Sequence, residues 1–323
     1  MRGRCFARGI VGVMALVFAC ALPRAAAPSN PAARERVIID TDIGDDIDDA
    51  FAVALALHSD ELQIDGVTTA WGDTRLRAKL VNRLLRETGR EEIPVAQGIV
   101  TKPQYPFTQS RWAMKGADPK LKIDAPDFLL QEIRAHPGEI TLIAIGPLTN
   151  IGAAIDREPA TFRKLKRIVM MGGSIRRGYD DANGHAVMHP DAEYNIHMDP
   201  AAAQKVFQSG VPIFMMPLDS TQLRLEKARR DQIFHRGTPI TNDLRALYLE
   251  WGKPTPVLFD PMAVAYAIDP SVCPVTPLHA DVDKDGFTRE GPGVANVSAC
   301  LASSAERFFR FAMPRFLAKP QKN

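Results

Sequence analysis

The stretch VIIDTDIGDDIDDAFAVALAL, residues 37–57, joins a short apolar run to a cluster of acids and then to a second apolar run. Residues 36–40 are typical of a buried strand, and residues 48–57 are typical of a helix. Six carboxylates fall within the ten residues from Asp40 to Asp49. Like charges held this closely repel one another, so a stable fold requires a cation or buried protons to offset them. The stretch therefore predicts a strand-to-helix turn that carries chemistry.

The composition is that of a globular protein. Of the 323 residues, 46% are hydrophobic and 24% are charged, which is sufficient for one large α/β domain or two small ones. No linker rich in Pro, Gly or Ser divides the chain. We therefore expect one domain over residues 28–323.

The first 27 residues have the three parts of a secretory signal peptide. Arg2, Arg4 and Arg8 precede an apolar run over residues 10–22, and small residues follow at positions 25–27. The apolar run is shorter than the about 20 residues that a membrane-spanning helix needs. We therefore expect a cleaved leader, a secreted or periplasmic protein, and no stable membrane span after processing. An uncleaved anchor and a lipoprotein attached at Cys20 are the alternatives.

Removal of this leader changes the charge and the cysteine count. The leader contains four arginines and no acids, so its loss takes the net charge from +2 to −2. A nearly neutral surface gives no general argument for binding to nucleic acid. Cys273 and Cys300 are the cysteines that remain. In an exported protein they could pair, but two separately buried thiols fit the sequence equally well.

Strand-like apolar runs alternate with helix-like segments along the rest of the chain. Such alternation implies right-handed crossovers and a mainly parallel sheet. We predict an α/β, Rossmann-like fold in which an open central sheet carries helices on both faces. The predicted strands cover residues 36–40, 62–70, 93–98, 140–146, 166–173 and 211–218. The predicted helices cover residues 48–57, 75–89, 199–210 and 241–252, and two more start at residues 148 and 260.

Polar loops follow the ends of several predicted strands. They are DTDIGDD (40–46), GPLTN (146–150), MGG (171–173), PLDST (217–221) and FDP (259–261). In open α/β sheets, ligands bind beyond the carboxyl ends of the strands, so we expect these loops to converge on one site. Two longer polar segments, residues 98–126 and 174–192, are predicted loops, and the first is a candidate lid.

The acids of the opening stretch fit a hard metal ion. Calcium takes about 6–8 oxygen ligands, mostly carboxylates and carbonyls. Acids at the start of a helix are also favoured by the helix dipole, and this alternative accounts for one or two of the six. It does not account for Asp40 and Asp42, which follow a buried strand. We therefore predict a metal site at this turn.

A second acidic segment, DVDKDGFTREGP at residues 281–292, has the D-x-D-x-D-G opening of a calcium loop. Such a loop needs a bidentate acid at its twelfth position, where this chain has Pro292. The flanking residues are typical of strands. We therefore predict a hairpin with its turn at Asp285–Gly286 rather than a second metal site.

The opening stretch resembles the first motif of the calcium-dependent nucleoside hydrolases, the inosine–uridine-preferring type. Further motifs of this family occur in the family's order and cover nearly the whole chain after the leader. After DTDIGDDIDDA (40–50) come TTAWGDT (68–74), IGPLTNI (145–151), MGG (171–173), AEYNIHMDPAAA (192–203), PLDST (217–221) and FDPMAVAY (259–266). Each motif is weak alone, but together and in order they are highly specific.

This resemblance implies hydrolysis of the N-glycosidic bond of a nucleoside to ribose and free base, with Ca²⁺ as cofactor and a homo-oligomer, a dimer or tetramer, as the assembly. The implied calcium ligands are the carboxylates of Asp42, Asp49 and Asp260 and the backbone carbonyl of Ile145. The implied sugar contacts are Asp73, Glu193, Asn195 and the backbone of Met171. Glu193 and Asn195 would point to the same side if the EYN segment is extended.

One aspartate is expected to take a proton from the attacking water as the anomeric carbon develops positive charge. This sequence has two more residues between Gly44 and Asp49 than the commonest family pattern. Counting back from Asp49 makes Asp48 the base, which we favour, and counting forward from Gly44 makes it Asp46. Asp40 is expected to support the site from behind or to be a further alternative base.

Two positions depart from the family pattern. The histidine that often precedes the last metal ligand, and that can protonate the leaving base, is Phe259 in this chain. The asparagine expected shortly before AEYN is Val187, and Asn183 is the residue that would substitute for it from a shifted loop. The candidates for the missing acid are His185, His189, His197, Tyr179 and Tyr194.

Two other functions remain open at the level of sequence. An exported sugar- or nucleoside-binding protein that has lost catalysis would be consistent with Phe259 and Val187. A Mg²⁺-dependent phosphatase with an Asp-x-Asp pair would share the acids of DTDIG, but it would need a small hydroxyl residue at Gly44 and a downstream lysine. Nucleoside turnover, binding without turnover, and phosphate release distinguish the three functions.

Overall fold

The computed structural model describes residues 34–102, 106–181 and 183–319, together with residues 1, 3 and 9. The chain divides into two units, Met1–Ala33 and Arg34–Asn323, and every helix and strand named below belongs to the second. The leader predicted over residues 1–27 lies outside the described residues apart from those three. None of the described helices is long and apolar enough to cross a membrane.

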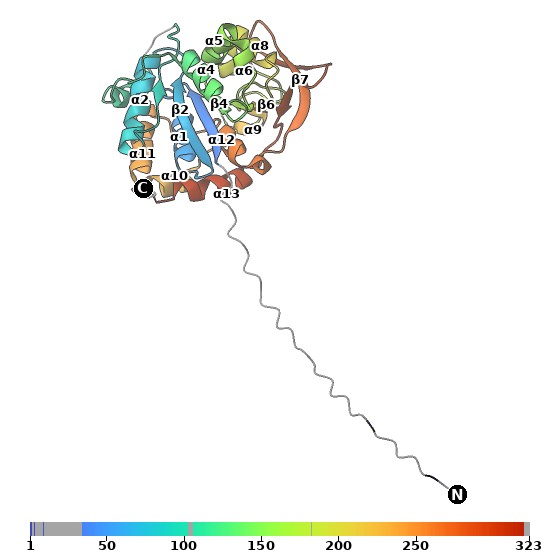
Figure 1. Ribbon diagram of the computed structural model, residues 1–323. Helices are drawn as coiled ribbons and strands as arrows, with labels where there is room; N and C mark the ends of the chain where they lie inside the picture. The colour runs from blue at the N-terminus through green and yellow to red at the C-terminus, as the bar shows by residue number, and fades with distance from the viewer. Residues whose placement is uncertain (2, 4–8, 10–33, 103–105, 182, 320–323) are drawn as a thin grey trace. The chain divides into compact units, whose positions relative to one another are not determined.

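A sheet of nine strands forms the centre of the described part of the chain (Figure 1). Its order is β3-β2-β1-β4-β5-β6-β9-β7-β8, and every neighbouring pair from β3 to β9 is parallel. β7 pairs antiparallel with both β9 and β8. The mainly parallel sheet predicted from the sequence is therefore confirmed. The strands are β1 (Glu35–Thr41), β2 (Leu62–Thr69), β3 (Val95–Ala96), β4 (Thr141–Ile145), β5 (Arg167–Met171), β6 (Ile213–Met216), β7 (Thr276–Val282), β8 (Thr288–Gly291) and β9 (Val297–Ala299).

Helices cover both faces of this sheet, as predicted (Figure 1). One core contains residues of α1, α2, α10, α11, α12 and α13, and the other contains residues of α4, α5, α6 and α8. The helices are α1 (Asp48–Leu57), α2 (Thr74–Glu87), α3 (Ser110–Ala113), α4 (Ala125–Ala135), α5 (Thr149–Arg157), α6 (Pro159–Phe162), α7 (Tyr194–His197), α8 (Pro200–Phe207), α9 (Leu218–Thr221), α10 (Lys227–Phe234), α11 (Pro239–Trp251), α12 (Pro261–Ile268) and α13 (Ala305–Phe316), and η1 (Pro270–Val272) is a 3₁₀ helix.

The two cores are built by the alternation of side chains along each strand. Val37 and Ile39 of β1 belong to the core that contains α1, whereas Ile38 between them belongs to the core that contains α4. The residues of β4 and β5 divide between the cores in the same way. Because both faces of these strands are buried, the strands are continuous apolar runs, and this is why the sequence pattern predicted them.

Side chains and glycines define the ends of several helices. Asp199 accepts a hydrogen bond from the Ala202 amide (3.0 Å) at the start of α8. Thr238 caps α11, which ends at Gly252 with φ 77°. Glycine adopts this left-handed conformation without steric cost, so it stops the helix and redirects the chain.

The acidic segment at residues 281–292 forms a hairpin, as predicted. β7 and β8 pair antiparallel, with Val282 opposite Thr288. In the turn, the Asp283 carboxylate accepts hydrogen bonds from the amides of Asp285 (2.9 Å) and Phe287 (3.0 Å). The Asp283 carboxylate therefore stabilises a turn between two strands, and the helix-flanked calcium loop is excluded.

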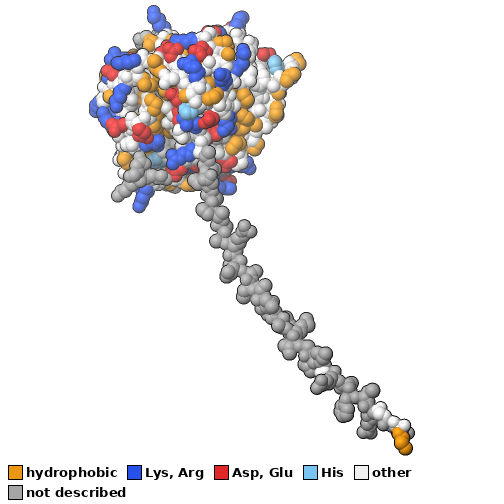
Figure 2. Space-filling view, viewed as in Figure 1, with side chains coloured by type: hydrophobic (Ala, Val, Ile, Leu, Met, Phe, Trp, Pro, Cys, Tyr) orange, Lys and Arg blue, Asp and Glu red, His pale blue; other side chains and the backbone are white. Residues whose placement is uncertain are grey.

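Charged side chains of both signs are interspersed on the face shown in Figure 2. Surface ion pairs of the described residues include Arg134 with Glu158 (2.7 Å) and Arg157 with Asp124 (2.7 Å). A face of mixed sign gives no general argument for binding to nucleic acid.

Candidate active site

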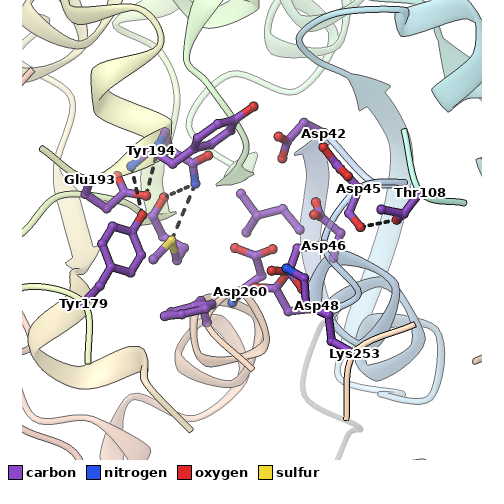
Figure 3. Close-up of a pocket in the computed structure, with 15 residues that line it drawn as sticks. Asp42, Asp45, Asp46, Asp48, Thr108, Tyr179, Glu193, Tyr194, Lys253 and Asp260 are labelled. Carbon is purple, nitrogen blue, oxygen red and sulfur yellow. Dashed lines mark hydrogen bonds between the residues drawn. The ribbon is translucent and has the colours of Figure 1, made fainter. Parts of the chain in front are cut away.

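A cavity of about 320 Å³ lies where the parallel strands end (Figure 3). The last residues of β4 and β5, Ile145 and Met171, contribute to its lining, and the residue before α12, Asp260, adds a carboxylate. The two long loops contribute Thr108 and Tyr179. The polar loops at the carboxyl edge of the sheet therefore converge on one cavity.

One side of this cavity is acidic. Asp48, Asp49 and Asp260 are buried, and each offers a carboxylate oxygen within 4.8 Å of those of the other two. This spacing suits three ligands of one metal ion. The predicted metal ligands were Asp42, Asp49 and Asp260, and Asp48 was the predicted base. In the structure, Asp42 lines the cavity but does not belong to this group of three. The acids on this side are Asp42, Asp45, Asp46, Asp48, Asp49 and Asp260.

Hydrogen bonds from the end of β1 and the start of α12 hold the three acids. The Thr41 hydroxyl donates to Asp49 (2.5 Å) and accepts from the Ile43 amide (3.1 Å). The Asp260 amide donates to the Asp48 carboxylate (3.3 Å). Within the described residues, no side chain caps the start of α1 by a hydrogen bond. Asp48 and Asp49 are therefore not explained as helix caps.

The predicted lid segment packs against the acidic loop. Gly44 has φ 130°, and a Cβ atom there would lie 2.6 Å from the Phe107 ring, so the loop requires glycine. The buried Gln109 side chain donates to the Asp46 carbonyl (3.0 Å), and the Gln109 amide donates to the Gly44 carbonyl (2.9 Å). This part of the segment thus forms a packed wall of the cavity.

Arg77 is a buried cation beside the acidic loop, and it was not among the predicted site residues. Its guanidinium donates to the backbone carbonyls of Asp42, Ile43 (3.0 Å) and Trp71 (2.8 Å). Its charge lowers the pKa of Asp42 and Asp49, against the larger opposite effect of burial. In the sequence, RLRAKL is typical of the exposed face of an amphipathic helix, so no local pattern marks this arginine.

Burial raises the pKa values of the acids in the cavity. Desolvation raises the pKa of Asp42 to about 6 and those of Asp48, Asp49 and Asp260 well above their usual range, and repulsion among the acids adds to the effect. A cation among these oxygens would favour the ionised carboxylates instead. The donors are all oxygen atoms and mostly carboxylates, so the residues present fit a hard cation.

Asp40 lies behind the cavity and is not among the described residues that line it. Its carboxylate accepts from the Thr68 hydroxyl (2.5 Å) and the Asn150 amide (2.8 Å), and burial raises its pKa to about 6. Asn150 also donates to the Thr69 carbonyl (3.0 Å). Asp40 therefore connects β1 to β2 and α5, and it supports the strand end that carries Asp42.

Asp73, which was predicted to hold the sugar, caps α2. Its carboxylate accepts from the Leu76 amide (3.0 Å), and it is not among the described residues that line the cavity. Trp71 and Gly72 both have φ 64°, a left-handed conformation that turns the chain at the end of β2. The motif TTAWGDT is present, but the structure uses its aspartate to begin a helix.

The side of the cavity opposite the acids contains Glu193 and Asn195. The buried Glu193 carboxylate accepts from the amides of Gly173 (2.8 Å), Asn195 (3.0 Å) and Ile196 (3.2 Å), yet burial dominates and raises its pKa to about 7. Two of these amides belong to the first turn of α7, so the EYN segment starts a helix and the condition of an extended segment is not met. Asn195 still lines the cavity, and its side-chain amide donates to the Met171 carbonyl (3.2 Å).

Phe259, at the position of the family histidine, lines the cavity and contacts the Tyr179 ring edge to face, with centroids 6.1 Å apart. Tyr179 and Tyr194 both line the cavity, and burial raises the pKa of both hydroxyls, that of Tyr194 to about 12. Of the five candidates for the leaving-group acid, the structure thus brings the two tyrosines to the site. The candidates that are not among the described lining residues are His185, His189 and His197.

Lys253 also lines the cavity, and it was not among the predicted site residues. It is the one cationic side chain among the described lining residues. It follows Gly252, the residue that ends α11, and its charge lowers the pKa of Asp46 against the larger effect of burial. A lysine in GKPTPV belongs to none of the motifs, so no sequence signal could have found it.

A mainly parallel sheet with a carboxylate-lined cavity at its carboxyl edge has the ligand-binding arrangement of open α/β proteins. A family model described as inosine-uridine preferring nucleoside hydrolase matches residues 37–310. The chain belongs to this family, and it is a hydrolase that acts on N-glycosyl bonds. The resemblance inferred from the ordered motifs is therefore confirmed.

Individual proteins agree with this placement. The chain is 30% identical over 287 residues to the pyrimidine-specific ribonucleoside hydrolase RihA of Citrobacter koseri, and the match covers 80% of this chain and 88% of that protein. It is 32% identical over 283 residues to a probable uridine nucleosidase 2 of Arabidopsis thaliana, and this match covers 79% of this chain and 84% of that protein. The solved structure of a plant nucleoside hydrolase, PpNRh1, has a TM-score of 0.77 at 28% identity and covers 88% of this chain and 100% of that one. A purine-preferring ribonucleoside hydrolase from Gardnerella vaginalis, 24% identical with a TM-score of 0.74, covers 87% and 98% and shares the fold.

Proposed function

We propose that this enzyme hydrolyses the N-glycosidic bond of nucleosides to ribose and free base, with calcium on the acidic side of the cavity. The observation that carries the proposal is the group formed by Asp48, Asp49 and Asp260 in the same cavity as Glu193 and Asn195. The cavity volume falls within the range of about 300–1,000 Å³ that is common for small-molecule sites. A sugar between the two sides would present its anomeric carbon to the acids.

The proposed calcium ligands are the carboxylates of Asp42, Asp49 and Asp260 and the backbone carbonyl of Ile145, as the family resemblance implies. All four residues line the cavity. When bound, calcium would polarise a water molecule and orient the sugar hydroxyls. The backbone carbonyl explains how an apolar residue contributes to an acidic site.

The proposed base is Asp48, whose carboxylate would take the proton of water as its oxygen attacks the anomeric carbon. The surrounding carboxylates would stabilise the positive charge that develops on the sugar. One observation favours Asp42 as a second candidate. Asp48 offers an oxygen to the group of three acids, where it would act as a ligand, whereas Asp42 stands outside the group and burial raises its pKa to about 6. A base with a pKa near the working pH is efficient, and Asp46 remains the alternative left by the sequence spacing.

Glu193 and Asn195 are the proposed sugar-binding residues. Three backbone amides hold the Glu193 carboxylate, and the Met171 carbonyl holds the Asn195 amide group. Both side chains are therefore oriented before a substrate arrives, which reduces the entropy lost on binding. Asp73, also predicted as a sugar contact, has no corresponding place among the described lining residues.

Pyrimidine ribonucleosides such as uridine are the proposed first substrates. Two similar proteins are named a pyrimidine-specific ribonucleoside hydrolase and a probable uridine nucleosidase, which supports this choice. In this chain the wall near the leaving base would be aromatic, because Phe259 occupies the position of the family histidine and packs on Tyr179. The base preference then depends on how these rings accept a pyrimidine or a purine.

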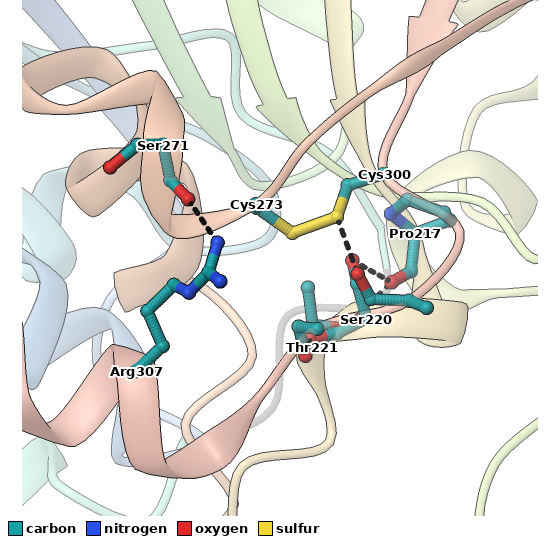
Figure 4. Close-up of a disulfide and its surroundings, with 9 residues drawn as sticks. Pro217, Ser220, Thr221, Ser271, Cys273, Cys300 and Arg307 are labelled. Atoms are coloured by element: carbon teal, nitrogen blue, oxygen red, sulfur yellow. Dashed lines mark hydrogen bonds between the residues drawn. A yellow bond between two sulfur atoms is a disulfide. The ribbon is translucent and has the colours of Figure 1, made fainter.

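Export to the periplasm or the medium is also proposed. The leader-like sequence of residues 1–27 supports it, and so does a disulfide between Cys273 and Cys300, whose Cα atoms lie 5.8 Å apart (Figure 4). Disulfides persist in oxidising compartments and are rare in the cytosol. The family resemblance further leads us to propose a dimer or tetramer, which light scattering on the purified protein tests.

The experiment is the release of reducing sugar by residues 28–323 from uridine, cytidine, inosine and guanosine, with calcium and then with a calcium chelator. We expect release with calcium, loss with chelator, and recovery when calcium is restored. Binding of calcium and uridine without release would support the binding-protein alternative instead. Phosphate release from a phosphomonoester would support the phosphatase alternative, against which family membership already argues.

A further inference from the structure

The cavity has two chemically different sides, and one of them carries the hydroxyl of Tyr179, so far considered only as a candidate for the leaving-group acid. The acids lie on one side, and Tyr179 lies on the other, beside Glu193 and Tyr194 (Figure 3). The Tyr194 amide donates a hydrogen bond to the Tyr179 hydroxyl oxygen (3.1 Å). Because the oxygen accepts this bond, its own proton is free to be donated. Among the described residues, none accepts a hydrogen bond from the Tyr179 hydroxyl.

The ring and backbone of Tyr179 are both held in place. The ring packs edge to face against Phe259, with an interplanar angle of 80°. The Tyr179 amide donates to the Asp191 carboxylate (2.8 Å), and the Asp191 amide donates to the Ser174 hydroxyl (2.9 Å). The hydroxyl is therefore presented by a fixed side chain and not by a freely rotating one.

The segment that leads to Tyr179 is anchored by the PLDST motif and the residue after it. The buried Asp219 carboxylate accepts from the amides of Ile175 (2.9 Å) and Arg176 (2.9 Å). The Gln222 side chain donates to the Gly178 carbonyl (2.9 Å) and accepts from the Asp180 amide (2.5 Å). These bonds hold the backbone on both sides of Tyr179. They give a physical function to a motif that lies outside the described lining of the cavity.

The same loop explains why Val187 stands at the position where the family pattern has an asparagine. The Gly178 amide donates to the Val187 carbonyl (3.0 Å), so the two arms of the loop pair at this point. Val187 itself is not among the described residues that line the cavity, whereas Tyr179, next to its partner Gly178, is. The polar group that the family pattern places at Val187 is thus absent, and a neighbouring arm of the same loop brings a hydroxyl to the cavity.

We propose that Tyr179 is a substrate-binding residue whose hydroxyl donates a hydrogen bond to the 5′-hydroxyl of the nucleoside sugar. This inference rests on the proposed function. A ribosyl group carries hydroxyls at the 2′, 3′ and 5′ positions, and the cation on the acidic side would orient the vicinal 2′ and 3′ pair. The 5′-hydroxyl is then the sugar group left for the opposite side, where Tyr179 and Glu193 lie. Tyr179 donates there, and Glu193 offers an acceptor.

The test combines Tyr179→Phe with removal of the 5′-hydroxyl from the substrate. Kcat/KM is measured for uridine and 5′-deoxyuridine with wild type, Tyr179→Phe and the control Tyr266→Phe. The control substitution also removes a tyrosine hydroxyl, but Tyr266 belongs to α12 and is outside the described lining of the cavity. We expect Tyr179→Phe to lower kcat/KM about tenfold on uridine, the size of one hydrogen bond, and less than twofold on 5′-deoxyuridine. Tyr266→Phe should change neither by more than about twofold.

The possible outcomes distinguish a contact between Tyr179 and the substrate from a purely structural role of Tyr179 in its loop. Equal losses on the two substrates would show that Tyr179 only supports the loop, and an unchanged kcat/KM on uridine would show no contact; either overturns the inference. The inference is also overturned if the loss of kcat/KM in Tyr179→Phe depends on the identity of the base and not on the presence of the 5′-hydroxyl. If the wild type cleaves no nucleoside, the proposed function fails, and calorimetric binding of uridine and 5′-deoxyuridine in calcium decides the inference. The inference then requires that the difference in affinity between uridine and 5′-deoxyuridine is smaller for Tyr179→Phe than for wild type. An equal difference in the two proteins rejects the contact. Wild type that binds neither ligand also rejects it.

Discussion

Asp48 and Asp260 lie 212 positions apart in the chain, yet the Asp260 amide donates a hydrogen bond to the Asp48 carboxylate (3.3 Å). The bond joins the starts of α1 and α12, and helix N-termini carry a partial positive charge that favours anions. Burial and mutual repulsion nevertheless raise the pKa of both carboxyl groups well above the usual range. The two helix ends therefore hold an acidic group that needs a cation or protons to offset its charge.

Calcium should accordingly stabilise the folded protein. At free calcium about 100 times its Kd, we expect the free energy of unfolding to rise by about 2.7 kcal/mol, measured by calorimetry with and without chelator. Asp260→Asn should remove most of this gain. Asp156→Asn is the matched control, because Asp156 is an exposed acid paired with Lys205 on the surface, and it should keep the gain. A wild-type Tm that does not respond to calcium contradicts the metal site.

The variants Asp48→Asn and Asp42→Asn should separate the base from a ligand. The variant without the base should lose kcat by at least about 100-fold while it keeps its calcium affinity. The variant without a ligand should bind calcium more weakly and recover kcat at saturating calcium. Calcium titration calorimetry and kcat for uridine measure the two effects. If neither variant loses kcat at saturating calcium, both assignments fail and Asp46 is the next residue to change.

Glu193 should make the stability of the calcium-free protein depend on pH. Burial raises its pKa from an ordinary 4.5 to about 7, so the folded state binds the proton more tightly than the unfolded chain. The resulting stabilisation is complete below the unfolded pKa and is lost as the pH rises through the folded pKa. Stability in chelator should therefore fall between about pH 5 and about pH 7, by up to about 1.4 kcal/mol per pH unit from this group.

The Glu193→Gln variant should flatten this fall in urea unfolding experiments across the same pH range. Glutamine does not titrate, so the proton that Glu193 takes up on folding disappears, whereas the other buried acids keep their contribution. Glu290→Gln is the control, because Glu290 is exposed and pairs with Arg176 at the surface. Equal slopes for Glu193→Gln and wild type would show that another buried acid carries the pH dependence.

The sheet was predictable because its strands are buried on both faces. Residues 37–39 and 142–145 are unbroken apolar runs, and a local pattern is sufficient to identify them. The convergence of the acids on one cavity followed from the rule that parallel strands present their carboxyl ends together. Helices that begin in segments without a clear apolar periodicity were not predicted. α4 begins at the Asp124 cap inside the predicted lid, and α13 contains Pro314.

The details of the site depend on contacts between distant residues, which no local pattern contains. The role of Arg77 depends on the carbonyls of the β1–α1 loop. The capping role of Asp73 depends on the left-handed conformation of Trp71. The position of Tyr179 depends on Phe259 and on the anchoring of its loop, which are set by the folded chain. Sequence motifs therefore located the site, and long-range packing determined which side chains face it.

The Cys273–Cys300 disulfide should stabilise the fold without affecting catalysis. It closes a loop with a sequence separation of 27, for which loop-closure entropy predicts a contribution of about 3.5 kcal/mol to the free energy of unfolding. The variant Cys273→Ala/Cys300→Ala should lose about this much in urea unfolding. Neither cysteine is among the described residues that line the cavity, so kcat on uridine at 25 °C should stay within about twofold of wild type.

Wild type treated with reductant is the matched control for this variant, because it keeps both side chains and loses only the cross-link. If the stabilisation arises from the constrained unfolded chain, the reduced wild type and the double variant should be destabilised by similar amounts. A much larger loss in the double variant would assign part of the effect to packing, because both cysteines are buried. Equal stability of oxidised wild type, reduced wild type and variant would contradict the pairing, and with it one of the two arguments for export.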